Sequence, residues 1–272
     1  MPMPDFICPG MQKGGTSWLY DQLSVHPDFH LAPYKELHFF NKPAPQVALT
    51  RMHKAYLARP EGEPGHPFFE AVSRAEGRWG DMALYPHFFE GAEGRLAGDI
   101  TPGYSTLSAE KVQALADACP AARVILMVRE PSARVLSQFH MGVRVRRFSP
   151  DDISTPERLD AFLRLPRVAD RAFPTAIFAR WSAAFAQCRA YLMDDLIADP
   201  VAFRASVITY LGGDPTIEVG PGADFNAKQN DAKVELADWQ RKQVFDYFAE
   251  ERVRCAEMFG GAAEAWPSRE FQ

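Results

Sequence analysis

The sequence predicts an α/β fold, with a P-loop-like, mainly parallel β-sheet flanked by helices. Short apolar segments alternate along the chain with longer segments of helical periodicity, which is typical of such sheets. Residues 123–128 are apolar at nearly every position, as in a central parallel strand that is buried on both faces. A glycine-bearing turn follows the first apolar segment and precedes the first helical one, which is the order of a phosphate-binding βα unit.

The elements follow from local patterns, taken in chain order. Strands are expected at residues 5–9, 29–31, 96–101, 123–128 and 190–193. Helices are expected from about residue 16, over 108–118 with Ser108 as N-cap, from about 131, over 176–188 and 201–211, and along the tail at 232–259. Prolines and glycines break the pattern within residues 43–78, around a loop near residue 62. We expect a single domain over residues 1–272, with 43–78 as an insertion.

Composition excludes several functional classes. The net charge of −5 argues against a general nucleic-acid binder, which would carry a basic excess. No uncharged apolar run reaches the roughly 18 residues of a membrane span, and the N-terminus lacks a signal-peptide pattern. Four cysteines lie far apart without a CxxC pair, so reduced thiols are expected rather than a zinc site or a disulfide framework. We therefore expect a cytoplasmic protein.

The turn at residues 10–17 almost fits the Walker A spacing G-x-x-x-x-G-K-[ST]. Thr16 stands where a nucleotide triphosphatase carries its lysine, and the lysine of this turn lies three residues earlier, at Lys13. Backbone amides at the start of the helix can still bind an anion, because they have no partners within the helix. The alternative is a turn in which the glycines serve only backbone geometry.

A second candidate motif follows the strongest strand. Arg129 lies at the carboxyl end of that strand, where open α/β sheets bind ligands, and Ser137 follows about two turns into the next helix. An arginine and a serine placed in this way can bind a phosphate. The alternative is a surface arginine that pairs with Glu130 beside a solvated serine.

Together the two motifs resemble sulfotransferases that depend on 3′-phosphoadenosine 5′-phosphosulfate (PAPS). Lys13-Gly14-Gly15-Thr16-Ser17-Trp18 resembles their 5′-phosphosulfate loop, and Arg129 with Ser137 resembles their 3′-phosphate motif. Three further segments resemble the heparan-sulfate type of this family, in its bacterial, soluble form: 36–40, 101–104 and 194–200. The similarity covers residues 5–212 and is weak beyond them.

The resemblance implies a function and a set of roles. A sulfuryl group would pass from the co-substrate PAPS to a small-molecule or glycan acceptor, with release of 3′-phosphoadenosine 5′-phosphate (PAP). Lys13 would stabilise the leaving group. The 5′-phosphate would be held by Gly14, Gly15, Thr16 and Ser17, and the 3′-phosphate by Arg129 and Ser137.

Glu36 would be the general base, and the two phenylalanines nearby suggest that burial raises its pKa. An ion pair with Lys35 is the alternative role for Glu36, and His38 and His140 are the alternative bases. Trp18 would pack near the adenine or, equally, belong to the core. The histidines form no metal motif, so transfer without a metal is expected.

Two departures from the family pattern bear on the substrate. Ile100 stands where heparan-type enzymes carry a lysine before Thr-Pro, which weakens the case for a highly anionic glycan acceptor. No Lys/Arg-Gly loop is found near the C-terminus, where Lys228 or Lys233 would have to close over the 3′-phosphate. The insertion at 43–78 is expected to border the acceptor site, because loops on a rigid scaffold commonly set specificity.

Two other functions remain open from the sequence. A nucleotide-dependent phosphotransferase would use the same turn and would consume ATP with Mg²⁺. A non-catalytic nucleotide-binding protein would bind PAPS without turnover. The presence of both Lys13 and Glu36 favours an enzyme.

Overall fold

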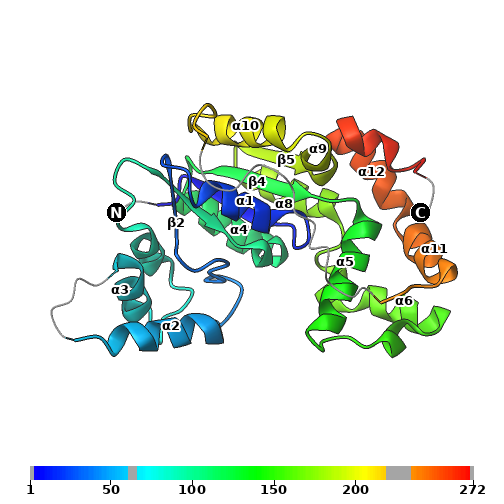
Figure 1. Cartoon of the computed structure of the whole chain (residues 1–272), viewed down its shortest axis with the longest axis horizontal. Coiled ribbons are helices and arrows are strands. Elements are labelled where there is room, and N and C mark those ends of the chain that lie inside the picture. The colour runs from blue at the N-terminus through cyan, green and yellow to red at the C-terminus, as the bar shows by residue number, and fades with distance from the viewer. Residues whose placement is uncertain (1–2, 61–65, 219–233, 270–272) are drawn as a thin grey trace.

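A parallel β-sheet forms the centre of the structure, which is a computed structural model (Figure 1). It describes residues 3–60, 66–218 and 234–269. Within these residues the sheet has five strands in the order β2-β3-β1-β4-β5, and every pairing is parallel. The strands are β1 (Phe6–Gly10), β2 (Phe29–Leu31), β3 (Leu96–Ile100), β4 (Arg123–Val128) and β5 (Cys188–Leu192). The predicted fold class is confirmed.

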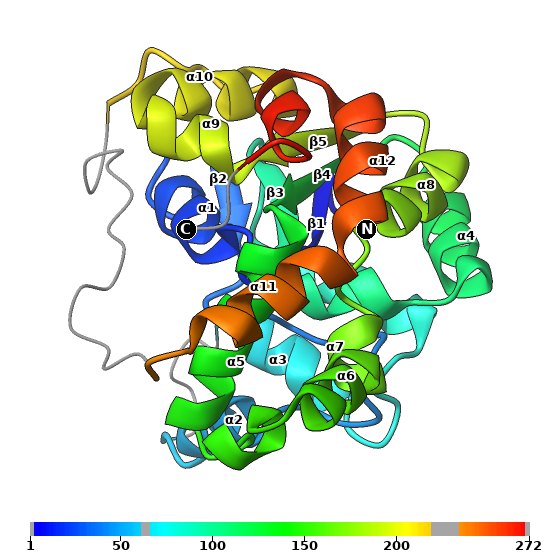
Figure 2. The same cartoon turned by 90° about the vertical axis from the view of Figure 1, so that its right-hand side faces the viewer.

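Helices cover both faces of this sheet, as Figure 2 shows. The α-helices are α1 (Thr16–Leu23), α2 (Val47–Leu57), α3 (Pro67–Arg74), α4 (Ala109–Ala118), α5 (Pro131–Arg144), α6 (Pro156–Arg164), α7 (Pro166–Ala169), α8 (Pro174–Ala184), α9 (Met193–Ala198), α10 (Pro200–Leu211), α11 (Asp238–Tyr247) and α12 (Ala249–Phe259). Four 3₁₀ helices are described as well: η1 (Met82–Phe89), η2 (Pro102–Thr106), η3 (Pro150–Ile153) and η4 (Gly261–Ala265).

Side chains of the central strands alternate between two apolar layers. In β4, Ile125 and Met127 pack with α1, α9 and α10, whereas Leu126 and its neighbours on the other face pack with α3, α4 and α8. This alternation follows from the two-residue period of a strand, and it explains why β4 is apolar throughout. A third apolar cluster joins α5, α6, α7 and α11 beside the sheet.

Most predicted elements lie within a few residues of their expected positions, and Ser108 caps α4 by accepting from the Lys111 amide. The helices α6 and α7 are not among the elements expected from the sequence, although Thr155-Pro156 is a helix-start signal and the Thr155 side chain caps α6. The described part of the tail contains two helices rather than one continuous helix, with a break at Phe248. The cysteines are free, as expected.

The carboxyl ends of β1, β3 and β4 meet at one edge of the sheet. β1 leads into the turn at residues 10–15, β3 into Thr101-Pro102, and β4 into Arg129. The predicted phosphate loop, the Thr-Pro segment and the second motif are therefore neighbours in space, although they are spread over about half of the chain.

Candidate active site

The glycine-bearing turn packs tightly on the end of β4. Met11 N donates to Met127 O at 2.8 Å, and Gly14 N donates to Met11 O at 3.0 Å. A Cβ on Gly14 would lie 2.3 Å from the Met127 carbonyl oxygen, so only glycine fits there. Gly15 has a φ of 99° and caps α1 without a side-chain hydrogen bond. The glycines thus bring the amides at the start of α1 to the sheet edge, where they can bind an anion.

We predict that Gly14→Ala disrupts this turn. The added methyl group would clash with backbone, which yields less readily than a side chain, and the free energy of unfolding should fall by about 1–3 kcal/mol. Thermal unfolding and PAP titration measure the effect on stability and on binding. Gly94→Ala is the control, because it has open space but a φ of 74°, so it reports only the cost of a left-handed backbone. Unchanged PAP affinity in Gly14→Ala would show that the turn does not bind the nucleotide.

The two predicted motifs are in contact. Arg129 is half-buried after β4, and its Nη1 donates to the carbonyl oxygen of Lys13 at 3.5 Å. Burial lowers the pKa of Arg129 and outweighs the opposite effect of two nearby carboxylates. Ser137 is half-buried in α5. Lys13 and Arg129 are more than a hundred residues apart in the sequence, and the sheet brings them into contact.

Glu130 is occupied by other partners than Arg129. Its carboxylate accepts from the amides of Ser132 and Ala133, at 3.0 and 2.7 Å, and so caps α5. It also lies 4.0 Å from Arg252 Nη1. The alternative role considered for Arg129, a surface ion pair with Glu130, is therefore not what the structure describes.

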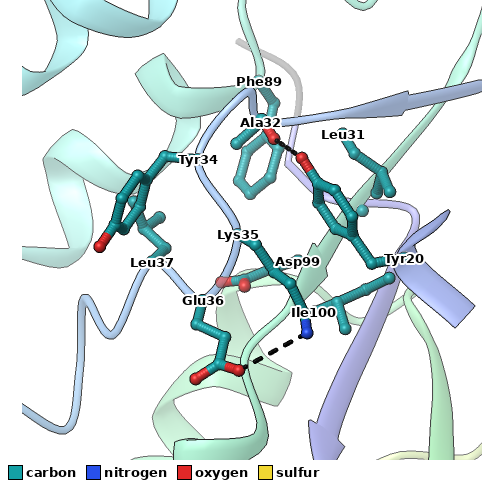
Figure 3. Close-up of a pocket in the computed structure, with 11 residues that line it drawn as sticks. Tyr20, Leu31, Ala32, Tyr34, Lys35, Glu36, Leu37, Phe89, Asp99 and Ile100 are labelled. Atoms are coloured by element: carbon teal, nitrogen blue, oxygen red, sulfur yellow. Dashed lines mark hydrogen bonds and ion pairs between the residues drawn. The ribbon is translucent and has the colours of Figure 1, made fainter. Parts of the chain in front are cut away.

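Glu36 lies beside the phosphate loop, joined to it by Lys35. The Lys35 Nζ donates to Ser17 Oγ at 2.6 Å and lies 3.7 Å from Glu36 Oε1, as Figure 3 shows for the ion pair. From the sequence, Lys35 is expected only as an ion-pair partner of Glu36, and its contact with Ser17 is not expected. Its position next to Glu36 was the available signal. Lys35, Glu36 and Ile100 line the same pocket at the sheet edge.

His38 contacts the other oxygen of the carboxylate. His38 Nε2 lies 3.3 Å from Glu36 Oε2, and His38 Nδ1 lies 2.9 Å from Asn41 Oδ1. A Cβ on Gly103 would lie 2.5 Å from the His38 ring, so the glycine of Thr101-Pro102-Gly103 allows this approach. Glu36 and His38 both have positive φ, at 62° and 55°, as Lys13 does at 73°. Left-handed backbone in residues with side chains is costly and concentrates at functional sites.

The pKa of Glu36 departs from its ordinary value in the direction opposite to the prediction. Burial does raise it, as expected. The hydrogen bond from His38 and the positive charges of Lys35 and Lys42 lower the pKa by more than burial raises it, so the pKa of Glu36 is below its ordinary value. The expectation of a raised pKa was wrong, because the neighbouring phenylalanines indicate burial but not these cations. The side chain is 34% exposed and carries a carboxylate at neutral pH.

A buried polar cluster holds this segment against the sheet. Asp99 in β3 accepts from Tyr85 OH at 2.8 Å and from Thr101 Oγ1 at 2.6 Å, and burial raises its pKa. The hydroxyl of Tyr104 accepts from the Phe39 amide at 3.0 Å. The Thr-Pro-Gly-Tyr segment therefore supports the backbone between Glu36 and Phe40, which is a positioning role.

The remaining predicted residues lie outside this group or outside the described residues. Trp18 is buried in the apolar layer of α1 and α10, where its ring packs edge-on against Phe203 at 5.5 Å, and its contact with the adenine stays a prediction. His140 lies in α5. Lys228 and Lys233 fall outside the described residues. Among the residues described, no group of three or more His, Cys, Asp or Glu side chains is arranged to hold a metal ion, and no helix there has the length and apolarity to cross a membrane.

Comparison with known proteins identifies the family. The model of the sulfotransferase family matches residues 4–214. A sulfotransferase from Alicyclobacillus acidocaldarius has the same fold, with a TM-score of 0.70, 23% identity and coverage of 98% of this chain and 99% of its own. The sulfotransferase domain of the Synechococcus olefin synthase matches with a TM-score of 0.49 and 16% identity, over 90% of this chain and 94% of its own. The chain belongs to the sulfotransferase family.

Proposed function

We propose that this protein transfers a sulfuryl group from PAPS to a hydroxyl group or an amine of a small-molecule or glycan acceptor and releases PAP. The observation that carries the proposal is the contact of Lys35 with both Ser17 and Glu36, at 2.6 and 3.7 Å. Only the Lys35 side chain therefore separates the Glu36 carboxylate, which can take a proton, from the loop that can bind a phosphate. Membership of the sulfotransferase family supports sulfuryl transfer as the chemistry.

Each group has a role in this reaction. The amides of Gly15, Thr16 and Ser17, in the turn that Gly14 shapes, bind the 5′-phosphate, and Arg129 with Ser137 binds the 3′-phosphate. Glu36 takes the proton of the acceptor as the acceptor atom forms its bond to sulfur and the bond from sulfur to the phosphate oxygen breaks. Lys13 stabilises the negative charge that develops on that oxygen. Fixed charges and in-line positioning account for such transfers, as they do in phosphoryl transfer.

His38 fits a supporting role better than that of the base. Its Nε2 contacts the Glu36 carboxylate rather than facing away from it. In this arrangement His38 orients Glu36 and helps to keep it ionised. The segment at 43–78 remains the proposed border of the acceptor site, supported by the bond from Gln46 Nε2 to the Glu36 carbonyl oxygen at 2.7 Å.

Transfer of labelled sulfur tests the proposal. The protein is incubated with PAPS labelled in its sulfuryl group and with a set of phenols, alcohols, amines and sugars, and the products are separated. We expect the label to move to at least one acceptor with formation of one PAP for each product. Transfer of γ-phosphate from ATP with Mg²⁺, without any use of PAPS, would instead identify a phosphotransferase, and PAP binding with no transfer would identify a non-catalytic binder.

A further inference from the structure

Arg252 is a buried arginine that joins the C-terminal helix α12 to the start of α5. It is 2% exposed, and α12 lies beyond residues 4–214, which the family model matches. Its Nη1 donates to Ser132 Oγ at 3.3 Å and to the Phe245 carbonyl oxygen. The same nitrogen lies 4.0 Å from Glu130 Oε1. Through Ser132 and Glu130, the arginine ties α12 to the first turn of α5.

The carboxylate of Glu130 caps α5, and Arg252 compensates its charge. Glu130 is buried, and its two oxygens accept from the amides of Ser132 and Ala133. A buried carboxylate is stable only where hydrogen bonds and an opposite charge replace water. Arg252 brings a positive charge to this carboxylate from α12. Loss of the arginine would leave the carboxylate buried and less well compensated, so the first turn of α5 is expected to rearrange.

The first turn of α5 lies between the two residues proposed to bind the 3′-phosphate. Arg129 directly precedes Glu130, and Ser137 lies two turns into α5. The contact of Arg129 Nη1 with the Lys13 carbonyl oxygen, at 3.5 Å, is at the long limit of a hydrogen bond and holds the guanidinium weakly. The position of Arg129 therefore depends on the backbone that enters α5, which Arg252 and Glu130 hold.

The neighbouring residue of α12 contacts a different helix. Glu251 is as buried as Arg252, and its Oε1 accepts from the amide and the hydroxyl of Thr175 at 3.0 and 2.8 Å. Thr175 lies in the first turn of α8, which Figure 2 shows beside α12, and belongs to neither phosphate motif. Glu251 therefore attaches α12 to α8, whereas Arg252 attaches it to α5. Both residues stabilise the packing of α12, but the contacts of Arg252 lead to Arg129.

We propose that Arg252 is a positioning residue for recognition of the 3′-phosphate. It holds the first turn of α5 so that Arg129 and Ser137 can bind that phosphate, and it does so from inside the protein, without touching the nucleotide itself. This inference rests on the proposed function, because it concerns the nucleotide site of that reaction. It gives a C-terminal helix outside both phosphate motifs a role in the choice of nucleotide.

Calorimetric titration with PAP and with 5′-AMP tests this role. The two nucleotides differ in the 3′-phosphate, so the ratio of their dissociation constants in folded protein reports recognition of that phosphate. For Arg252→Met we expect PAP affinity to fall at least about tenfold and 5′-AMP affinity to fall less than about twofold. Glu251→Gln is the matched control, because it removes an equally buried charge from the same helix. It should lower the Tm but leave the ratio unchanged.

A double variant tests whether Arg252 acts through Arg129. In the Arg129→Ala background, Arg252→Met should lower PAP affinity by less than about twofold, because two residues that serve the same contact do not have additive effects. A further loss of about tenfold would overturn the proposed route from Arg252 to the phosphate.

The outcomes separate this role from the proposed function. If wild-type protein does not prefer PAP to 5′-AMP, the proposed nucleotide site is wrong and both proposals fail. If wild-type protein has the preference and Arg252→Met keeps it, or Glu251→Gln loses it equally, the positioning role alone fails. Should Arg252→Met not fold, Ser132→Ala gives the same test, because it removes the hydroxyl that Arg252 contacts. It should reduce the preference about threefold, and an unchanged preference would overturn the role.

Discussion

Lys13→Met is expected to lower kcat by about 10²–10³-fold while leaving PAP affinity nearly unchanged. Lys13 lies in the turn between β1 and α1, with its carbonyl oxygen held by Arg129 Nη1 at 3.5 Å. A cation at this position stabilises charge that appears on the leaving phosphate oxygen only as the bond to sulfur breaks. Loss of one such group typically costs two to three orders of magnitude, or about 3–4 kcal/mol of barrier.

Single-turnover kinetics with PAPS and an acceptor found by the labelled-sulfur assay measure this effect. The control is Lys242→Met, which removes an exposed lysine from α11 and should leave kcat unchanged. A rise in KM at constant kcat would show that Lys13 only binds the donor, because uniform binding does not change the barrier of the chemical step.

Glu36→Gln is expected to lower kcat by about 10²–10⁴-fold, the usual contribution of a general base. Glutamine keeps the size of the side chain but cannot accept the proton. PAP affinity should remain, because the phosphate loop is not altered. Activity as high as in the wild-type protein would exclude Glu36 as the base and would favour His38 or His140.

The pH dependence of kcat follows from the lowered pKa of Glu36. The base is active when ionised, so kcat should rise with pH through a pKa below the ordinary range of glutamate and stay level toward neutral pH. Glu36→Gln should remove this acidic limb. If kcat of Glu36→Gln still fell toward acidic pH with a midpoint at about pH 6.5, the assignment would be contradicted. An imidazole typically titrates in that range.

The parts of the fold that depend on local patterns could be predicted from the sequence. The predicted strand at residues 123–128 coincides with β4, because a strand buried on both faces leaves an unbroken apolar run. The predicted strand at residues 190–193 begins two residues after the start of β5, because Arg189 and the half-buried positions of this edge strand weaken the apolar pattern. The helix α6 was missed although its Thr-Pro start was present.

The site could be predicted as a set of residues but not as a geometry. Lys13 and Arg129 were chosen from two separate motifs, and the sheet brings them together. The contact between Lys35 and Ser17 joins residues 18 positions apart through the fold, and no local pattern indicates it. The pKa of Glu36 was predicted in the wrong direction for the same reason, because it depends on cations placed around the carboxylate by the folded chain.

The central claim is that the site binds a nucleotide with both a 3′- and a 5′-phosphate, and calorimetric titration tests it most directly. PAP, 5′-AMP and ATP with Mg²⁺ are titrated into the wild-type protein and into Arg129→Ala. We expect PAP to bind more tightly than the other two, and we expect Arg129→Ala to lose that preference by about 10–100-fold, the effect of one charge-assisted contact to a phosphate. Binding of ATP with Mg²⁺ in the absence of PAP binding would contradict the account and would identify a phosphotransferase.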